Sequence, residues 1–273
     1  MARYNDKQTI RRHYDVVSPY YRSLWGEHIH HGYWTRGDES KEQAQIQLIE
    51  HLAKTAGMPA RCTLLDCGCG FGGTAIYLAK KFGAQVTGIT ISPVQVEMAN
   101  RAAEREGAEA NFVLMDAEQM KFERKFDVIW TTESVAHYQD AAKFFAAAAE
   151  ALRPAGVLAI TDWFKREKLT AAETRKFIKP IDMSMMVDLH TMGEYEEWIR
   201  AGGLKITARE ILNEQCAKTW DIGMDVIKRR EFWQLAARKG GEFVRFLRGF
   251  SAMRAGFASG NFIYGLLVAK KRA

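Results

Sequence analysis

Two short segments of the chain carry residue types that could do chemistry. The first reads LLDCGCGFGG from Leu64 to Gly73 and places Asp66 just before alternating glycines, among them Gly68 and Gly70. Such glycines permit a tight turn and a close approach of the backbone to a ligand. If a helix begins near Gly73, its free N–H groups and its positive dipole end add to the turn. The segment therefore predicts a nucleotide-binding turn.

Asp66 indicates which nucleotide this turn suits. The pattern D-x-G-x-G-x-G differs from the G-x-G-x-x-G of nicotinamide enzymes, and the strand end about 20 residues further on, at 88–92, lacks the acidic residue that holds a ribose. A pyrophosphate is disfavoured by a facing carboxylate, whereas a cationic amino-acid moiety is favoured by it. The turn therefore favours S-adenosylmethionine (SAM) over NAD.

The second segment, Glu133 to Tyr138, reads ESVAHY. Methyl transfer from a sulfonium is an in-line displacement that requires a positioned acceptor and often the removal of one proton. A histidine is a natural base near pH 7, so His137 is the first candidate, with substrate positioning as the alternative. Asp162 is the second candidate, as a base or as a group that orients His137; its alternative is a helix N-cap or a loop contact. Glu133 could polarise the acceptor or order the SAM loop.

The loop at 25–34, WGEHIHHGYW, holds His28, His30 and His31. A histidine in such a lid could touch substrate. The three lack a carboxylate or cysteine partner at a familiar metal-ligand spacing, so we expect no metal. The cysteines do not complete a zinc pattern either, and we expect them to be reduced, buried, small residues. They are Cys62, Cys67, Cys69 and Cys216.

Alternating strand and helix patterns must position these segments. Strands are expected over 62–67, 85–91, 110–116, 126–131, 157–163, 204–212 and 262–269, and helices over 6–24, 40–56, 73–82, 93–106 and 140–152. The sequence therefore predicts an α/β fold with a doubly wound, Rossmann-like, seven-stranded sheet whose last strand is antiparallel. Right-handed crossovers place the carboxyl ends of the parallel strands on one edge, where ligands bind.

Helical patterns over 165–200 and 217–256 predict a cap over that edge. The cap is rich in methionine and aromatic residues, most of which we expect in its core, while the rest could line an apolar pocket. The expected divisions are an N-terminal helical lid and loop (1–56), a SAM-binding core (57–164), a substrate cap with one core strand (165–261), and the last strand with a tail (262–273).

Composition narrows the class of protein further. The chain has 273 residues, of which 47% are apolar and 26% charged, as in an ordinary globular protein. Neither an 18-residue apolar run nor a secretory signal is found, so a cytoplasmic protein is expected. Residues 1–164 carry 18 basic and 20 acidic side chains, whereas residues 165–273 carry 21 and 13. A basic second half suits nucleic acid, an anionic membrane surface or an anionic substrate, but helical spacing also indicates solvated helix faces.

Residues 12–163 resemble a class I SAM-dependent methyltransferase. The segments that carry the resemblance are LLDCGCGFGG (64–73), VTGITISPVQV (86–96), DAEQM (116–120) with FDVIWTTES (126–134), and ALRPAGVLAITD (151–162). The histidine-rich loop is similar to that of the subgroup containing γ-tocopherol C-methyltransferases, rebeccamycin-type sugar O-methyltransferases and, more distantly, cyclopropane fatty acid synthases. The resemblance fades over 165–260, where the acceptor would be selected.

The resemblance implies roles for individual residues around SAM. It assigns Asp66, Gly68 and Gly70 to the methionine part, Gln95 with flanking Thr90 and Ile91 to the ribose, Asp116 and Ala117 to the adenine, Thr132 and Glu133 to the sulfonium side, and Tyr33 with Tyr14 to the methionine carboxylate. The subgroup has E-S-x-x-H where this chain has Glu133 to His137. Some sugar O-methyltransferases carry a second histidine where this chain has Ala136.

We therefore expect a methyltransferase that acts on a small lipophilic or aromatic acceptor, at carbon, oxygen or nitrogen. One alternative is a cyclopropane synthase-like enzyme that modifies lipid acyl chains, with the basic cap contacting an anionic membrane. Another alternative is a SAM-binding protein without catalysis. Nucleic acid is disfavoured as a partner because the cationic residues do not form one extended stripe.

Overall fold

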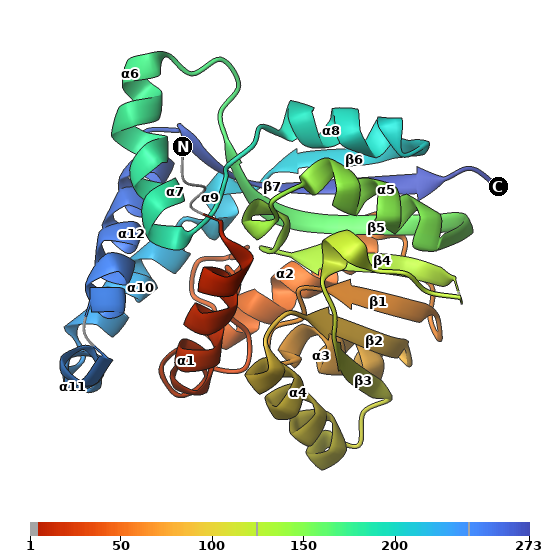
Figure 1. Cartoon of the computed structure of the whole chain (residues 1–273), viewed down its shortest axis with the longest axis horizontal. Coiled ribbons are helices and arrows are strands. Elements are labelled where there is room, and N and C mark those ends of the chain that lie inside the picture. Colours follow the sequence, from red (N-terminus) through yellow and green to blue (C-terminus); the bar gives the residue numbers. More distant parts are fainter. Residues whose placement is uncertain (1–4, 124, 240) are drawn as a thin grey trace.

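The strands of the protein form one mixed sheet. In the computed structural model, which describes residues 5–123, 125–239 and 241–273, the sheet has seven strands in the order β3-β2-β1-β4-β5-β7-β6 (Figure 1). The strands are β1 (Thr63–Cys67), β2 (Gln85–Thr90), β3 (Ala110–Leu114), β4 (Phe126–Thr132), β5 (Leu152–Lys165), β6 (Leu204–Ile211) and β7 (Phe262–Lys271). β1 to β5 pair in parallel, whereas β7 is antiparallel to both β5 and β6. The predicted fold class and the antiparallel last strand are confirmed.

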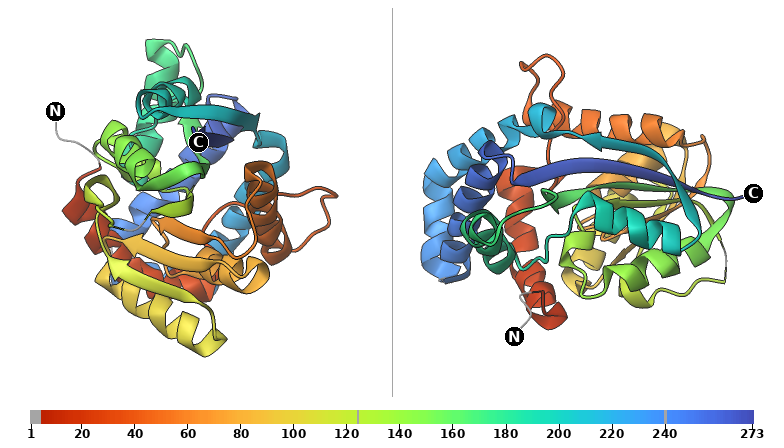
Figure 2. Two further views of the ribbon diagram at one scale, coloured as in Figure 1. Left: turned by 90° about the vertical axis from the view of Figure 1, so that its right-hand side faces the viewer. Right: turned by 90° about the horizontal axis from the view of Figure 1, so that it is seen from above.

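Helices cover both faces of the sheet (Figure 2). One face carries α2 (Lys41–Ala56), α3 (Gly73–Phe82) and α4 (Pro93–Glu106), and the other carries α5 (Ala141–Ala151) and α8 (Met192–Ala201). Successive residues of a strand point to opposite faces. Accordingly, Leu64 joins the core cluster that contains Leu48 of α2, while Leu65 joins the cluster that contains Phe144 of α5.

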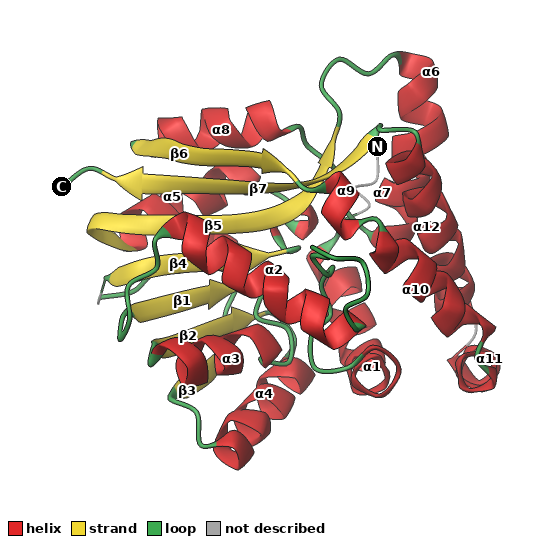
Figure 3. Cartoon of the chain, turned by 180° about the vertical axis from the view of Figure 1, so that it is seen from behind, coloured by secondary structure: helices red, strands yellow, loops and turns green. Residues whose placement is uncertain are grey.

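The remaining helices gather beyond the carboxyl ends of the parallel strands (Figure 3). They are α1 (Lys7–Trp25), α6 (Ala171–Glu173), α7 (Lys179–Met185), α9 (Asn213–Cys216), α10 (Lys218–Lys228), α11 (Arg230–Lys239) and α12 (Gly241–Ala258). The segment between α6 and α7, Thr174–Ile178, is a π-helical turn. The expected helical cap therefore exists, and α1 lies beside it as a lid over the same edge of the sheet.

Capping residues set the ends of α1 and α2, close to the limits of the predicted helices 6–24 and 40–56. Ser40 caps α2 by accepting the N–H of Gln43, and the Gln43 side chain returns the contact to the backbone of Ser40. Gly57 ends α2 in the left-handed conformation, at φ 60°. α1 begins after Asp6, whose carboxylate accepts the N–H of Thr9.

β5 is longer than the predicted strand. Leu152 pairs with Phe126 and Lys165 pairs with Phe262, so the strand covers Leu152–Lys165 rather than 157–163. The pairing of β5 with β4 shifts its register between Phe126 and Val128, and Pro154 lies in this irregular part. Proline is tolerated there because an irregular stretch does not require its missing N–H.

None of the described helices combines the length and the apolar character needed to cross a bilayer. The four cysteines are free and buried. Their side chains belong to the apolar core between the sheet and its two layers of helices.

Candidate active site

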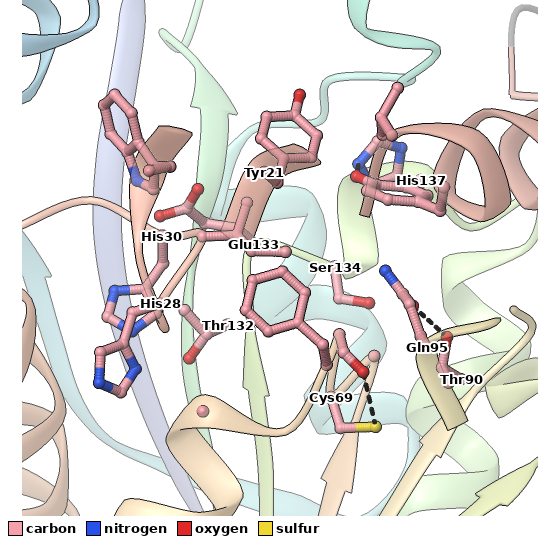
Figure 4. A pocket seen from close by; sticks show the side chains of 18 of the residues that line it. Tyr21, His28, His30, Cys69, Thr90, Gln95, Thr132, Glu133, Ser134 and His137 are labelled. Atoms are coloured by element: carbon pink, nitrogen blue, oxygen red, sulfur yellow. Dashed lines mark hydrogen bonds between the residues drawn. The ribbon is translucent and has the colours of Figure 1, made fainter. Parts of the chain in front are cut away.

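A cavity at the carboxyl edge of the sheet brings the two chemistry-bearing segments together. Asp66, Gly68 and Gly70 line it from the glycine turn. Glu133 and His137 line it from the end of β4 and the turn that follows (Figure 4). The other predicted cofactor residues that line this cavity are Thr90, Ile91, Gln95, Asp116, Ala117 and Thr132. The structure therefore places these residues around one space.

The glycine turn adopts a backbone that only glycine tolerates well. Gly68 and Gly70 have φ values of 78° and 54°. A Cβ atom on Gly68 would lie 1.9 Å from the hydroxyl of Ser134, so the turn approaches the end of β4 as closely as a glycine permits. The N–H groups of Gly68 and Cys69 donate to the carbonyl of Ile89, which fixes the turn against β2.

Asp66 is a buried carboxyl with an unsatisfied oxygen. Its side chain is 3% exposed, and its Oδ2 has no hydrogen-bond partner in the described part of the chain. Burial raises the pKa of Asp66 to about 7. An unpaired buried polar group is costly, so a cationic ligand group at this position would both satisfy the oxygen and favour its ionised form.

α1 is tied to the residues expected around the nucleoside. Lys7 Nζ donates to Asp116 at 2.6 Å, and Gln95 donates from Nε2 to the hydroxyl of Ser18 at 3.1 Å. The amide oxygen of Gln95 accepts from the hydroxyl of Thr90 at 2.6 Å. The polar groups of Gln95 and Asp116, assigned by resemblance to ribose and adenine, are thus engaged with the lid helix and β2.

His137 forms a couple with Tyr14 of α1. Its Nδ1 lies 3.2 Å from the carbonyl of Met186, and its Nε2 lies 3.1 Å from the phenol oxygen of Tyr14. Because the carbonyl can only accept, Nδ1 carries the hydrogen and Nε2 accepts from Tyr14. Burial lowers the pKa of His137 to about 4, so the imidazole is neutral near pH 7. Both ring nitrogens are therefore occupied by protein groups.

Glu133 has a constrained position at the end of β4. It is a non-glycine residue with φ 51°, a conformation that stores strain and often marks functional sites. Its Oε1 accepts from the backbone N–H of His31 at 2.7 Å, from Nδ1 of His31 at 2.9 Å and from the hydroxyl of Tyr264 at 2.8 Å. Although burial opposes ionisation, His31 holds the pKa of Glu133 below its usual value.

Two predicted site residues lie elsewhere. Asp162 is fully buried and is absent from the cavity wall; it accepts from the N–H of Ala136 and from the hydroxyl of Tyr195. Since Trp163 lines the cavity, the preceding side chain must point to the opposite face of β5. The side chain of Asp162 therefore does not face the cavity, and its role as a base stays a prediction, whereas the alternative, a contact with the 134–137 turn, is present.

Tyr33 also lies outside the cavity. Its ring stacks on His51 of α2 with centroids 4.6 Å apart, and its backbone N–H donates to the carbonyl of Ala44. Tyr33 therefore faces away from the cavity in this structure, and its contact with the methionine carboxylate stays a prediction. Tyr14, the second tyrosine assigned to that contact, does line the cavity.

The cap supplies an apolar wall to the same cavity. Trp25, Val226 and Phe232 form a buried cluster between α1, α10 and α11. The further apolar and aromatic lining residues from α1 and the cap include Ile10, Val17, Leu24, Met185, Trp220, Ile227, Phe250 and Met253. Among the described residues, no group of histidine, cysteine, aspartate or glutamate could hold a metal ion.

Sequence reasoning missed Lys7, Trp163 and Tyr264 as site residues. Tyr264 lies 131 residues from Glu133, within an apolar strand pattern that gave no functional signal. Lys7 lies in a polar helix pattern, and its contact with Asp116 spans 109 residues. Only the alternation of side chains along β5 could have indicated that Trp163 faces the ligand edge when Asp162 does not.

Comparisons with known proteins place the chain in a family. The sequence profile described as mycolic acid cyclopropane synthetase matches residues 2–258. The tocopherol O-methyltransferase of Arabidopsis thaliana chloroplasts is 36% identical over 182 residues, covering 61% of this chain and 52% of the plant protein. The 27-O-demethylrifamycin SV methyltransferase of Amycolatopsis mediterranei (strain S699) is 32% identical over 215 residues, covering 77% and 79%. The chain thus spans about half the length of the plant relative and more of the bacterial one.

Solved structures share the whole fold. The crystal structure of the 4+2 cyclase SpnF superposes with a TM-score of 0.86 and 25% identity, covering 97% of this chain and 96% of that one. The sheet order and the cap described above are therefore those of an established architecture rather than a new one.

Proposed function

The chain belongs to the mycolic acid cyclopropane synthetase family of class I SAM-dependent methyltransferases, and from this membership we propose that it transfers a methyl group from SAM to a small lipophilic acceptor. Relatives named for tocopherol and for a rifamycin support a lipophilic acceptor. The single observation that carries the proposal is the continuity of one cavity from the glycine turn to the aromatic wall of the cap.

The residues of the glycine turn fit SAM. The unsatisfied oxygen of Asp66 is suited to a cationic amino group, and the turn at Gly68 and Gly70 leaves room for a close approach. Thr90, Gln95 and Asp116 line the same space beside the turn. When SAM is bound, it supplies an activated methyl group, and the remaining work falls to this chain's own residues.

Those residues orient the acceptor and exclude water. α1 closes the polar end through Lys7 and Ser18, and it brings Tyr14 against His137. We propose that His137 acts mainly by holding Tyr14, since both of its ring nitrogens are engaged. Burial raises the pKa of Tyr14 further above its usual value, with Glu133 and Asp162 adding to the effect, so the phenol remains a hydrogen-bond donor to His137.

The family name favours one alternative, cyclopropane synthase-like modification of lipid acyl chains. In that case the basic second half of the chain would contact an anionic membrane. A second alternative is a SAM-binding protein without catalysis. In both alternatives the nucleotide site is retained, so the reaction product distinguishes them.

The test is methyl transfer by the purified full chain from radiolabelled SAM into a cell extract. The extract is then separated into apolar small-molecule, phospholipid and nucleic-acid fractions. Label in the apolar small-molecule fraction supports the proposal. Label in phospholipid supports the cyclopropane-type alternative, and an absence of label together with binding of S-adenosylhomocysteine (SAH) supports the non-catalytic one.

A further inference from the structure

The cavity contains a second hydrogen-bonded histidine, His31, which pairs with Glu133. It is distinct from the pair formed by His137 and Tyr14. His31 comes from the loop between α1 and α2 and is only 3% exposed, and it lines the cavity. Its backbone N–H and its Nδ1 both meet Oε1 of Glu133, and the hydroxyl of Tyr264 donates to the same oxygen. Three contacts to one carboxylate oxygen fix the position of the imidazole.

The partner of Nδ1 determines which tautomer His31 adopts. An ionised carboxylate only accepts, so the hydrogen of the neutral imidazole lies on Nδ1 and Nε2 carries a lone pair. Nε2 is buried and has no hydrogen-bond partner among the residues that the structure describes. A buried acceptor without a partner is costly, and a ligand with a donor hydrogen would satisfy it.

The surroundings of His31 indicate the chemical class of that donor. The ring stacks on Tyr264 at 4.4 Å and meets Trp220 edge-on at 4.7 Å and Trp163 at 6.2 Å. The indole N–H groups of Trp163 and Trp220 are also buried and unpartnered within the described ranges. A hydroxyl can donate to Nε2 and accept from an indole N–H, whereas a carbonyl or an ammonium group can do only one of these.

His137 is less suited than His31 to accept a hydrogen bond from such a hydroxyl. Its Nε2 already accepts from Tyr14, and its Nδ1 already donates to Met186. His30 offers a closer comparison because its Nε2 is also buried and unpartnered in the described chain. However, Nδ1 of His30 is backed by the neutral carbonyl of His31, at 2.8 Å, rather than by a carboxylate. A carboxylate makes an imidazole a stronger acceptor and stabilises its protonated form.

We propose that Nε2 of His31 receives the hydroxyl of the acceptor and takes its proton, which makes the acceptor a hydroxyl-bearing lipophilic compound such as a phenol. The O–H bond breaks and its proton bonds to Nε2, while the electron pair left on oxygen forms a new O–C bond to the methyl group. The C–S bond of the sulfonium breaks in the same step, and its electron pair stays on sulfur as SAH leaves. The imidazolium is stabilised by Glu133 and returns its proton to water after product release. The inference rests on the proposed function, since it names the acceptor class of that site.

The test uses a pair of probes that differ in one hydrogen-bond donor. 4-Heptylphenol and its methyl ether, 4-heptylanisole, are titrated into the full chain with SAH bound, and tryptophan fluorescence reports binding. The wild type should prefer the phenol by about fivefold or more, since one hydrogen bond to a buried acceptor is gained. His31→Asn keeps a donor near the Nδ1 position toward Glu133 but lacks Nε2, so the preference should fall to within about twofold.

Two further variants make the test specific. His30→Asn removes the imidazole whose Nδ1 meets the carbonyl of His31, and this variant should still prefer the phenol. His137→Asn should also still prefer the phenol. Three results would overturn the inference. The preference for the phenol could survive in His31→Asn, it could disappear in His137→Asn instead, or it could be absent from the wild type. SAH affinity, measured separately for each variant, shows whether the nucleotide site is intact. A wild type that fails to bind SAH would contradict the proposed function itself, whereas normal SAH binding without the preference contradicts the inference alone.

Discussion

The phenol oxygen of Tyr14 lies 3.1 Å from Nε2 of His137, although 123 residues separate the two along the chain. The contact joins the lid helix to the turn after β4, at the polar end of the cavity. Burial lowers the pKa of His137 to about 4, so its imidazole is neutral near pH 7. A neutral imidazole can accept the hydrogen bond that orients Tyr14.

This couple predicts non-additive losses. His137→Ala should leave SAH affinity within about threefold and reduce turnover by roughly 10² or more, because the group that orients Tyr14 is lost. Tyr14→Phe should give a loss of similar size, and the double variant should lose little more, since both changes break the same unit. Additive losses, measured as turnover at saturating SAM, would show that the two residues act separately.

The buried carboxyl of Asp66 predicts a pH dependence of nucleotide binding. Burial raises its pKa to about 7 in the free protein. We propose that its ionised form pairs with the cationic amino group of SAH, because its Oδ2 has no partner among the described residues. Affinity should therefore be complete above the pKa and fall as the pH falls through it, by about tenfold between pH 8 and pH 6.

Calorimetric titration of SAH across this pH range checks the prediction. Asp66→Asn cannot ionise, so its affinity should be weaker than that of the wild type near pH 8 and nearly independent of pH. A wild-type affinity that stays constant between these pH values would show that Asp66 does not pair with the ligand.

A side chain at Gly70 should abolish SAH binding, whereas the same backbone strain at a glycine outside the cavity should not. Gly70→Val places a side chain at φ 54° in the cavity wall and should abolish SAH binding. Gly57 is a matched control, since it has φ 60° and a Cβ there would meet nothing within 4 Å. Gly57→Val should cost a similar stability, about 1–2 kcal/mol, yet keep SAH affinity. Equal SAH affinity in the two variants would mean that the nucleotide binds elsewhere.

The burial of Asp162 predicts a structural rather than a catalytic role. Asp162→Asn weakens the contacts with Ala136 and Tyr195, so the free energy of unfolding should fall by about 1–3 kcal/mol, and the melting temperature should fall with it. Turnover by the folded fraction should fall by less than about tenfold, because the side chain does not face the cavity. A loss of 10² at unchanged melting temperature would restore Asp162 as a catalytic group.

Much of the fold could be predicted because local patterns and the sheet agree. Strand and helix patterns alternate from β1 to β3 and again from β4 through α5 to β5, and Ser40 and Gly57 flank α2 at the limits of its predicted range, 40–56. The glycine turn could also be located, since its pattern is contiguous in sequence. The upstream start of β5 was missed because Pro154 and Gly156 normally interrupt a strand, and here they lie in an irregular register.

The site could be predicted only where its residues are close in sequence or alternate simply. Contacts such as Lys7 with Asp116 and Glu133 with Tyr264 join distant segments, and no local pattern encodes them. The resemblance places Tyr33 at the methionine carboxylate, but in the structure His31 of the same loop lines the cavity and Tyr33 packs on His51. The orientation of a loop side chain depends on tertiary packing rather than on spacing.

The most direct test of the central claim uses SAM whose methyl group carries deuterium, incubated with the full chain and a lipophilic extract. We predict that mass spectrometry finds a small lipophilic product that retains all the deuterium atoms of the methyl group, in place of one acceptor hydrogen. A product in which a lipid acyl chain has gained a methylene that has lost one deuterium would contradict the account, and so would SAM-dependent chemistry on the extract without any transfer of label.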